Sequence, residues 1–219
     1  MHPIEKHQLE TLFALVESLY ADGPELLFHG WHHVEFVYNK AAVFAEDLAA
    51  DVLFTQSAAL VHDLNYLAHA GVWTPPSSGE SLRLQTLSKA GYTPAQTAQI
   101  EETIIAAETA CRGKNSLTPE MMALSDADTL FKALPTTAPI FAARFMQQNN
   151  YSVTRLARKI VAEQVPLLEQ DIYFYSDLAR RKYTAWAKAN LAVWQYVEES
   201  LADPDILKML EQAGVNTAE

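Results

Sequence analysis

Ala58-Ala59-Leu60-Val61-His62-Asp63-Leu64-Asn65-Tyr66 is an apolar segment interrupted by an adjacent histidine and aspartate. Burying such a polar pair is costly unless suitable partners compensate it. A divalent cation is one such partner, because neutral imidazole and carboxylate groups are both good metal ligands. A buried hydrogen bond between the two side chains, or an exposed turn of helix, explains the pair equally well. The rest of the sequence is needed to choose between these alternatives.

Apolar residues recur at intervals of three and four on both sides of this segment, which is typical of amphipathic helices. Helices are predicted at residues 4–20, 32–50, 80–90, 95–111, 118–134, 140–148, 153–168, 176–201 and 205–211. Another helix is predicted to begin near residue 54 and to carry His62-Asp63. Near the C-terminus one stripe is predicted to face the core: Trp186, Leu191, Trp194 and Val197. Because no segment alternates like a β-strand and no repeat is present, the sequence predicts an all-α fold, a compact multi-helix arrangement.

The size and charge of the chain limit its organisation and its partners. With 219 residues, 49% of them hydrophobic, it is most simply one domain spanning residues 1–219. Its formal net charge is -11, whereas binding to nucleic acid requires a dense basic surface, so we expect no nucleic-acid partner. A small phosphorylated substrate is still compatible with an acidic chain, because a metal ion and a few local cations can reverse the field inside a pocket.

Cysteine content and hydropathy indicate the compartment. Cys111 is the only cysteine, so no intrachain disulfide can form, and this suits a reducing cytosol. The first ten residues lack the apolar core of a signal peptide, and no apolar run approaches the roughly 18–20 residues of a membrane span. We expect a cytoplasmic protein with no membrane partner. The sequence leaves the oligomeric state open, with a homodimer as one outcome.

Four short stretches concentrate residues that can bind a metal ion. They are Phe28 to Val34 with three histidines, His62-Asp63, Glu80-Ser81, and Ser125 to Leu130 with two aspartates. Taken singly, a histidine at a helix start is more often a cap or a surface residue, and an aspartate pair in a helix is more often solvated. Taken together, these stretches offer two imidazoles and two carboxylates from three helices, which is the composition of a mixed nitrogen and oxygen metal site.

The order and spacing of His33, His62-Asp63 and Asp128 resembles the HD superfamily of metal-dependent phosphohydrolases. Ala59 to Asp63 is similar to the motif that names the family, and the segment from His33 to Ala41 is similar to its first-histidine helix. The resemblance covers about residues 25–134, with accessory helices at both ends. It implies an HD-type domain and an enzyme that hydrolyses a small phosphorylated molecule, either a nucleotide or a related phosphate ester.

The resemblance also implies one divalent metal ion, and its ligands would be His33, His62, Asp63 and Asp128. His62 and Asp63 would be the catalytic pair. The sequence does not distinguish Mn, Mg, Co, Fe, Ni and Zn. His33 is favoured over His32 because the apolar stripe Val34, Val37, Ala41, Phe44 follows it. Asp126 would stand behind the ligands or be solvated.

The chain departs from several branches of that superfamily. Leu64-Asn65-Tyr66 follows the motif where the alarmone hydrolases carry a Glu-Asp pair. No histidine lies between His69 and Asp128, although binuclear members, di-iron oxygenases among them, need two more there. Three carboxylates would be the substitutes: Glu101, Glu102 and Glu108. Thr129 stands where an arginine is common. A mononuclear site is therefore favoured, and the substrate is not specified.

Phosphate charge must be met by donors close to the metal ion. The candidates for binding substrate are His29, Lys40, Arg83 and Lys132. The lysines and the arginine are, taken singly, more often surface residues than ligands. Two rival functions stay open. One is a non-catalytic HD module that binds metal or nucleotide and signals through a partner, and the other is a di-iron HD-type oxygenase.

The longest predicted loop runs from Gly71 to Gly79, directly after the helix that carries His62-Asp63. Its glycines allow hinge motion, while Pro75-Pro76 keeps its middle extended. Trp73 either covers bound substrate as part of a lid or plugs the loop onto the core. The plug is the favoured alternative.

Overall fold

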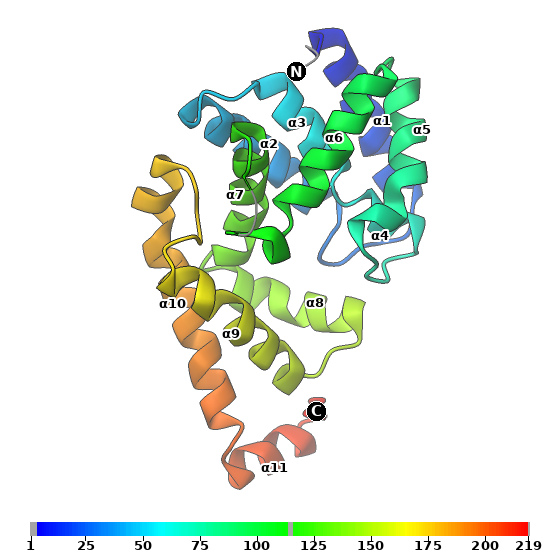
Figure 1. Ribbon diagram of the computed structural model, residues 1–219. Helices are drawn as coiled ribbons and strands as arrows, with labels where there is room; N and C mark the ends of the chain where they lie inside the picture. Colours follow the sequence, from blue (N-terminus) through cyan, green and yellow to red (C-terminus); the bar gives the residue numbers. More distant parts are fainter. Residues whose placement is uncertain (1–3, 114–115, 219) are drawn as a thin grey trace.

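The computed structural model describes residues 4–113 and 116–218, and within these ranges it contains helices and no strands (Figure 1). The prediction of an all-α fold is therefore confirmed. The α-helices are α1 (Lys6–Asp22), α2 (Trp31–Asp47), α3 (Val52–Val61), α4 (Leu64–Ala68), α5 (Glu80–Lys89), α6 (Pro94–Ala107), α7 (Pro119–Ala133), α8 (Ala142–Asn149), α9 (Val153–Glu169), α10 (Asp177–Ser200) and α11 (Pro204–Gln212). Short helical turns lie at η1 (Pro76–Gly79), η2 (Thr109–Cys111) and η3 (Thr137–Phe141).

The helix predicted to run through His62-Asp63 is interrupted there. α3 ends at Val61, and α4 begins at Leu64 after Asp63 adopts φ -102° and ψ 12°. The start of α3 is fixed by Asp51, whose carboxylate accepts the N–H of Phe54 at 3.0 Å. His62-Asp63 therefore lies at a helix junction and not in the middle of a helix.

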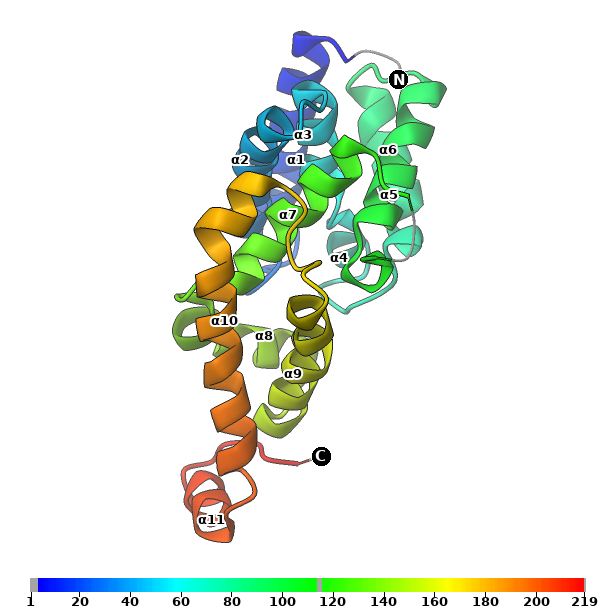
Figure 2. The ribbon, with the colours of Figure 1, turned by 60° about the vertical axis from the view of Figure 1, so that its left-hand side comes forward.

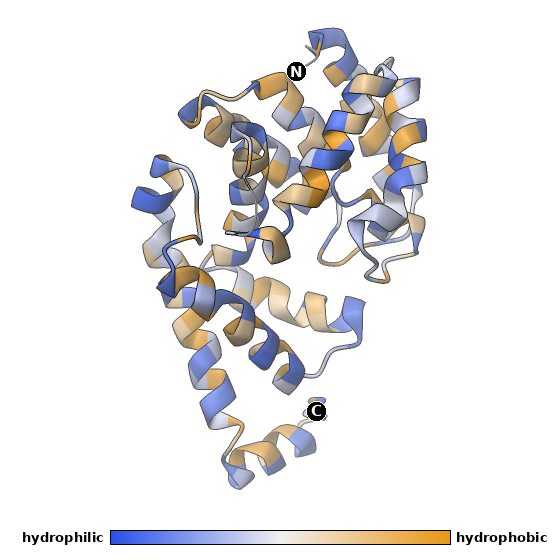
Figure 3. Cartoon of the chain, viewed as in Figure 1, coloured by the Kyte–Doolittle hydropathy of each residue, from blue (hydrophilic) through white to orange (hydrophobic). Residues whose placement is uncertain are grey.

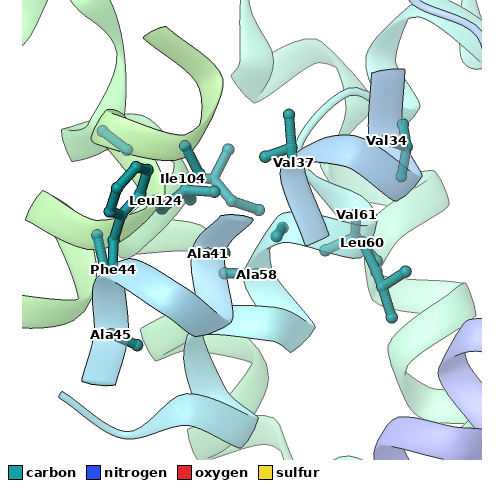
Figure 4. Close-up of a cluster of buried hydrophobic side chains, with 14 of the residues drawn as sticks. Val34, Val37, Ala41, Phe44, Ala45, Ala58, Leu60, Val61, Ile104 and Leu124 are labelled. Atoms are coloured by element: carbon teal, nitrogen blue, oxygen red, sulfur yellow. The ribbon is translucent and has the colours of Figure 1, made fainter. Parts of the chain in front are cut away.

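The core is centred on α2, which packs most extensively against α3 and α7. The apolar stripe of α2, from Val34 to Phe44, is completely buried, as are Ala58, Leu60 and Val61 of α3 (Figure 4). Burying these aliphatic groups supplies the main favourable term in folding. Because His33 directly precedes Val34, the same packing that buries the stripe carries the His33 side chain into the protein interior, where it is 1% exposed.

The C-terminal helices extend away from this core. α9 and α10 pack against each other around a small second cluster that includes Leu156 and Trp194, and α10 runs along the outer edge of the molecule (Figure 2). Apolar residues continue along α10 and α11 in this part of the chain (Figure 3). The terminal segment returns to α9, where the N–H of Val153 donates to Asn216 O at 3.0 Å. Among the described residues, no helix is both long and apolar enough to cross a membrane.

Candidate metal centre

Three elements bring four sequence-predicted ligands to one point. α2 supplies His33, the junction between α3 and α4 supplies His62 and Asp63, and α7 supplies Asp128. His33 Nε2 lies 3.2 Å from His62 Nε2, 3.2 Å from Asp63 Oδ2 and 3.4 Å from Asp128 Oδ1. His62 Nε2 is in turn 3.4 Å from Asp63 Oδ2. Residues that are 95 positions apart in the sequence (128 - 33) thus converge within a few ångströms.

His33, His62 and Asp128 can hold a metal ion, because one donor atom from each lies within 4.8 Å of the others. Two ligands at right angles on an ion with bonds of about 2.1 Å lie about 3 Å apart, close to the separations seen here. The tautomer of His62 also fits. Its Nδ1 lies 2.7 Å from Ala59 O and donates to that carbonyl, which leaves the lone pair of Nε2 directed at the cluster.

Asp63 adds a buried carboxylate oxygen that a cation can contact. Its Oδ2 is buried and has no hydrogen-bond donor, although two histidine rings stand beside it. Burial alone would raise the pKa of Asp63, but His62 and then His33 hold that pKa well below its usual range. Asp63 is thus a carboxylate in the protein interior, where it needs a compensating positive charge, and either protonated His33 or a bound cation supplies one.

We predict that metal binding is strongly pH-dependent because His33 competes with protons. Burial lowers the pKa of His33, but its close contacts with the carboxylates of Asp128 and Asp63 outweigh burial and raise that pKa to about 9. In the metal-free protein the ring is therefore charged at neutral pH, and a metal ion must displace its proton. Metal affinity should rise about tenfold per pH unit up to about pH 9 and then level off.

Isothermal titration calorimetry in two buffers of different ionisation enthalpy would measure this effect. About one proton should be released per bound ion at neutral pH. An affinity that stays constant as the pH is raised from neutral to about 9 would contradict the assignment of His33 as a ligand.

Aromatic rings enclose the cluster on the side of α2. The Phe131 ring meets the His33 ring edge-on at 4.6 Å, and the Phe28 ring lies 6.4 Å away on another side. His29 is buried, stacks on Tyr66 at 3.7 Å, and contacts the Gln148 amide through Nδ1 at 2.8 Å. Burial lowers the pKa of His29 to about 3, so this ring is neutral and does not supply positive charge to a phosphate. His32 is exposed, as expected for a residue off the buried face of α2, and its ring stacks on Phe141 at 5.4 Å.

The structure separates the three long cations predicted to bind substrate. Lys132 lies at the cluster, with Nζ 2.9 Å from Asp128 Oδ2. Within the described residues, Lys40 makes no contact with the cluster. Its Nζ lies 5.9 Å from the centre of the Phe36 ring. Arg83 is a correction. It is fully buried and forms two 2.6 Å hydrogen bonds with Glu101, so it holds α5 to α6 and is not presented to a substrate.

Asp126 is also a correction, because it is neither solvated nor behind the ligands. It is completely buried, accepts the N–H groups of Tyr175 and Ser176 at 2.8 and 2.7 Å, and pairs with Arg112 at 3.5 Å. Arg112 in turn donates to Thr129 Oγ1 at 2.8 Å, which explains why that position holds a small hydroxyl. Asp126 therefore anchors the segment before α10 to α7.

Two further features were not expected from the sequence, which named Glu108 only as a possible substitute ligand. Glu108, at the end of α6, keeps an exposed side chain, yet partial loss of hydration raises the pKa of its carboxyl to about 7, against the opposing effect of Lys132. This carboxyl can therefore gain or lose a proton near neutral pH. A cavity of about 320 Å³ beside the start of α2 is lined by Tyr20, His32 and Arg144, among others. Arg144 carried no sequence signal because it belongs to no motif.

Trp73 does not plug the loop onto the core, so the favoured alternative was wrong. Its side chain is 59% exposed, and the loop containing it ends in the turn η1. We predict that Trp73→Ala raises KM or lowers kcat for the phosphorylated substrate that the resemblance implies, while leaving the melting temperature and the metal content nearly unchanged. Val72→Ala, in the adjacent and equally exposed residue, is the matched control. A fall in melting temperature with normal kinetics would contradict a lid.

Comparisons with known proteins establish the fold and leave the activity open. No family model matches the chain. YpgQ, an uncharacterized protein from Bacillus subtilis, is 42% identical to the chain over 60 residues, which is 27% of this chain and 28% of YpgQ. The crystal structure of YpgQ superposes with a TM-score of 0.58 at 19% identity and covers 91% of this chain and 97% of YpgQ. A solved Lactobacillus plantarum protein gives a TM-score of 0.65 at 18% identity and covers 91% of this chain and 98% of that one.

Proposed function

We propose that this chain is a metal-dependent phosphohydrolase of the HD superfamily that acts on a small phosphorylated molecule, either a nucleotide or a related phosphate ester. The observation that carries the proposal is the convergence of His33, His62, Asp63 and Asp128 around one point. These are the ligands that the sequence resemblance implies. Phosphate esters are substrates that such a site can hydrolyse, because a bound divalent ion lowers the pKa of water and polarises a phosphoryl oxygen.

The protein's own groups would perform three tasks in this reaction. The Nδ1–H bond of His62 to Ala59 O fixes the ring that faces the ion. Asp63, held ionised by its histidine neighbours, would orient the attacking water as well as bind the ion. Lys132 remains charged, because its 2.9 Å contact with Asp128 raises its pKa against the effect of desolvation, and it would offset negative charge that develops on the phosphate.

Glu108 is the group best suited to carry a proton in this site. With a pKa raised to about 7, it is partly protonated at neutral pH and partly a base. Its side chain lies within electrostatic reach of Lys132, Asp128 and Asp63, which contribute to that pKa. A protonated Glu108 would donate to the leaving oxygen. This role differs from that of a ligand, and it leaves the mononuclear site intact.

A panel of nucleoside mono-, di- and triphosphates and simple phosphate esters tests the proposal. The native chain is loaded in turn with Mn, Mg, Co, Fe, Ni or Zn, and released phosphate and pyrophosphate are measured. Release by the native chain, and none by His33→Ala, is expected. Stoichiometric metal binding without release from any member would favour the non-catalytic module, whereas two ions per chain would favour the di-iron oxygenase.

A further inference from the structure

One face of α10 carries large apolar side chains that the protein does not cover. Trp186 is 39% exposed, Val193 is 49% exposed and Tyr196 is 71% exposed. Ala185 and Ala189 are also exposed. With about 100° of rotation per residue, these five positions fall in a single stripe along the helix. The prediction that Trp186 faces the core was wrong, because it belongs to this outer stripe.

The opposite face of α10 is apolar and packs against the rest of the chain. Leu191 and Trp194 are buried against the rest of the chain, and Asn190 donates to Lys132 O at 2.7 Å. α10 is therefore apolar on two faces, and the chain itself covers one of them. A helix that is apolar on two faces is normally covered on both. The outer stripe has the properties of an unoccupied helix-packing surface, since its alanines allow another helix to approach closely.

The charges beside the stripe indicate which partner fits. Arg181 and Lys182 lie toward the start of α10, and Glu199 lies toward its end. Arg181 and Glu199 are 18 residues apart (199 - 181), which is about five helical turns, so they lie on the same side of the stripe. Both are exposed, and neither has an ion-pair partner among the described residues. In an antiparallel pair of identical helices, Arg181 of each copy would approach Glu199 of the other.

We propose that a second copy of this chain covers the stripe, with the two α10 helices packed antiparallel across a twofold axis. Such an interface uses the same patch on both copies and is self-complementary. The start of α10 is basic, although the chain as a whole has a net charge of -11. It therefore attracts the acidic end of α10 in another copy, which favours the antiparallel orientation. α10 runs along the outer edge of the molecule (Figure 2), and the proposed interface does not depend on the proposed enzymatic activity.

Sedimentation equilibrium of the native chain and matched variants tests the apolar part of the interface. The native chain is expected to sediment as a dimer, and Val193→Glu as a monomer. Ile105→Glu, at a residue of α6 that is 46% exposed, is the matched control and is expected to leave the dimer intact. Circular dichroism checks that both variants fold. A monomeric native chain at high concentration, or a dimer that Val193→Glu leaves intact, would overturn the proposal.

Charge reversal tests the antiparallel orientation. Arg181→Glu places two like-charged pairs in the homodimer, as does Glu199→Arg, and each should weaken dimerisation about tenfold. Mixing the two variants restores opposite charges at both contacts, so a heterodimer of native affinity is expected. Parallel helices would instead place Arg181 beside Arg181, and neither single variant would weaken the dimer. Weakening by both variants without recovery on mixing would also rule out the antiparallel arrangement.

Discussion

Asp63→Ala is expected to abolish stoichiometric metal binding, and with it the hydrolysis of phosphate esters. The substitution removes a carboxylate whose Oδ2 lies 3.2 Å from His33 Nε2 and 3.4 Å from His62 Nε2. Loss of a residue that merely supports a ligand lowers metal affinity by roughly 10- to 100-fold, so the loss of a ligand should cost more. Metal content after desalting, measured by inductively coupled plasma mass spectrometry, should fall from about one ion per chain to nearly none.

His32→Ala is the matched control for this experiment. His32 adjoins a ligand in the sequence, but it is exposed and stacks on Phe141. The variant should keep its metal ion and most of its activity. If Asp63→Ala retains one ion per chain, the ion binds elsewhere. If His32→Ala loses its ion as completely as His33→Ala does, the wrong histidine of α2 has been assigned.

This cluster could be predicted because the order and spacing of its residues resemble the HD superfamily. The stripe Val34, Val37, Ala41, Phe44 fixed the buried face of α2 and therefore selected His33 over His32. The interruption at Asp63 could not be predicted in this way. Apolar residues continue through Leu64, so the sequence carries no local sign that α3 stops at Val61. The break depends on tertiary packing, and the spacing of apolar residues does not reveal it.

The errors share a physical cause, which is that partners distant in the sequence determine the role of a charged or aromatic residue. Arg83 was a candidate for binding substrate, but Glu101 on the next helix pairs with it. Trp186 was expected to be buried because it shares a helix with Trp194. Periodicity shows that both faces of α10 are apolar, but it does not show which face the rest of the chain covers.

Asp126 and Asp128 illustrate the same limit within one helix. Both are aspartates of α7, and only the second belongs to the motif that resembles the HD superfamily. The partners of the first are 49 and 50 residues away, at Tyr175 and Ser176. No residue close to Asp126 in the sequence indicates these partners. The two residues should consequently differ in what their removal does to the protein.

Asp126→Ala is expected to destabilise the fold by about 3–5 kcal/mol, because it leaves the buried guanidinium of Arg112 without its carboxylate partner. The backbone N–H groups of Tyr175 and Ser176 also lose their acceptor, and each unsatisfied donor adds to the cost. At roughly 2–4 °C per kcal/mol for a chain of this size, the melting temperature should fall by about 10 °C or more. Thermal unfolding followed by circular dichroism measures it.

Asp128→Ala is the control, and the two variants should be compared with a chelator present, because a bound ion stabilises the native state by itself. The Asp128 side chain is 24% exposed and that of its partner Lys132 is 38% exposed, so water replaces much of the ion pair that the substitution removes. Its melting temperature should therefore change less than that of Asp126→Ala. Metal binding should be affected in the opposite order. With metal added, Asp126→Ala keeps its ion below its melting temperature, whereas Asp128→Ala does not bind one. Equal destabilisation by the two substitutions under chelation would show that Asp126 does not anchor the segment before α10.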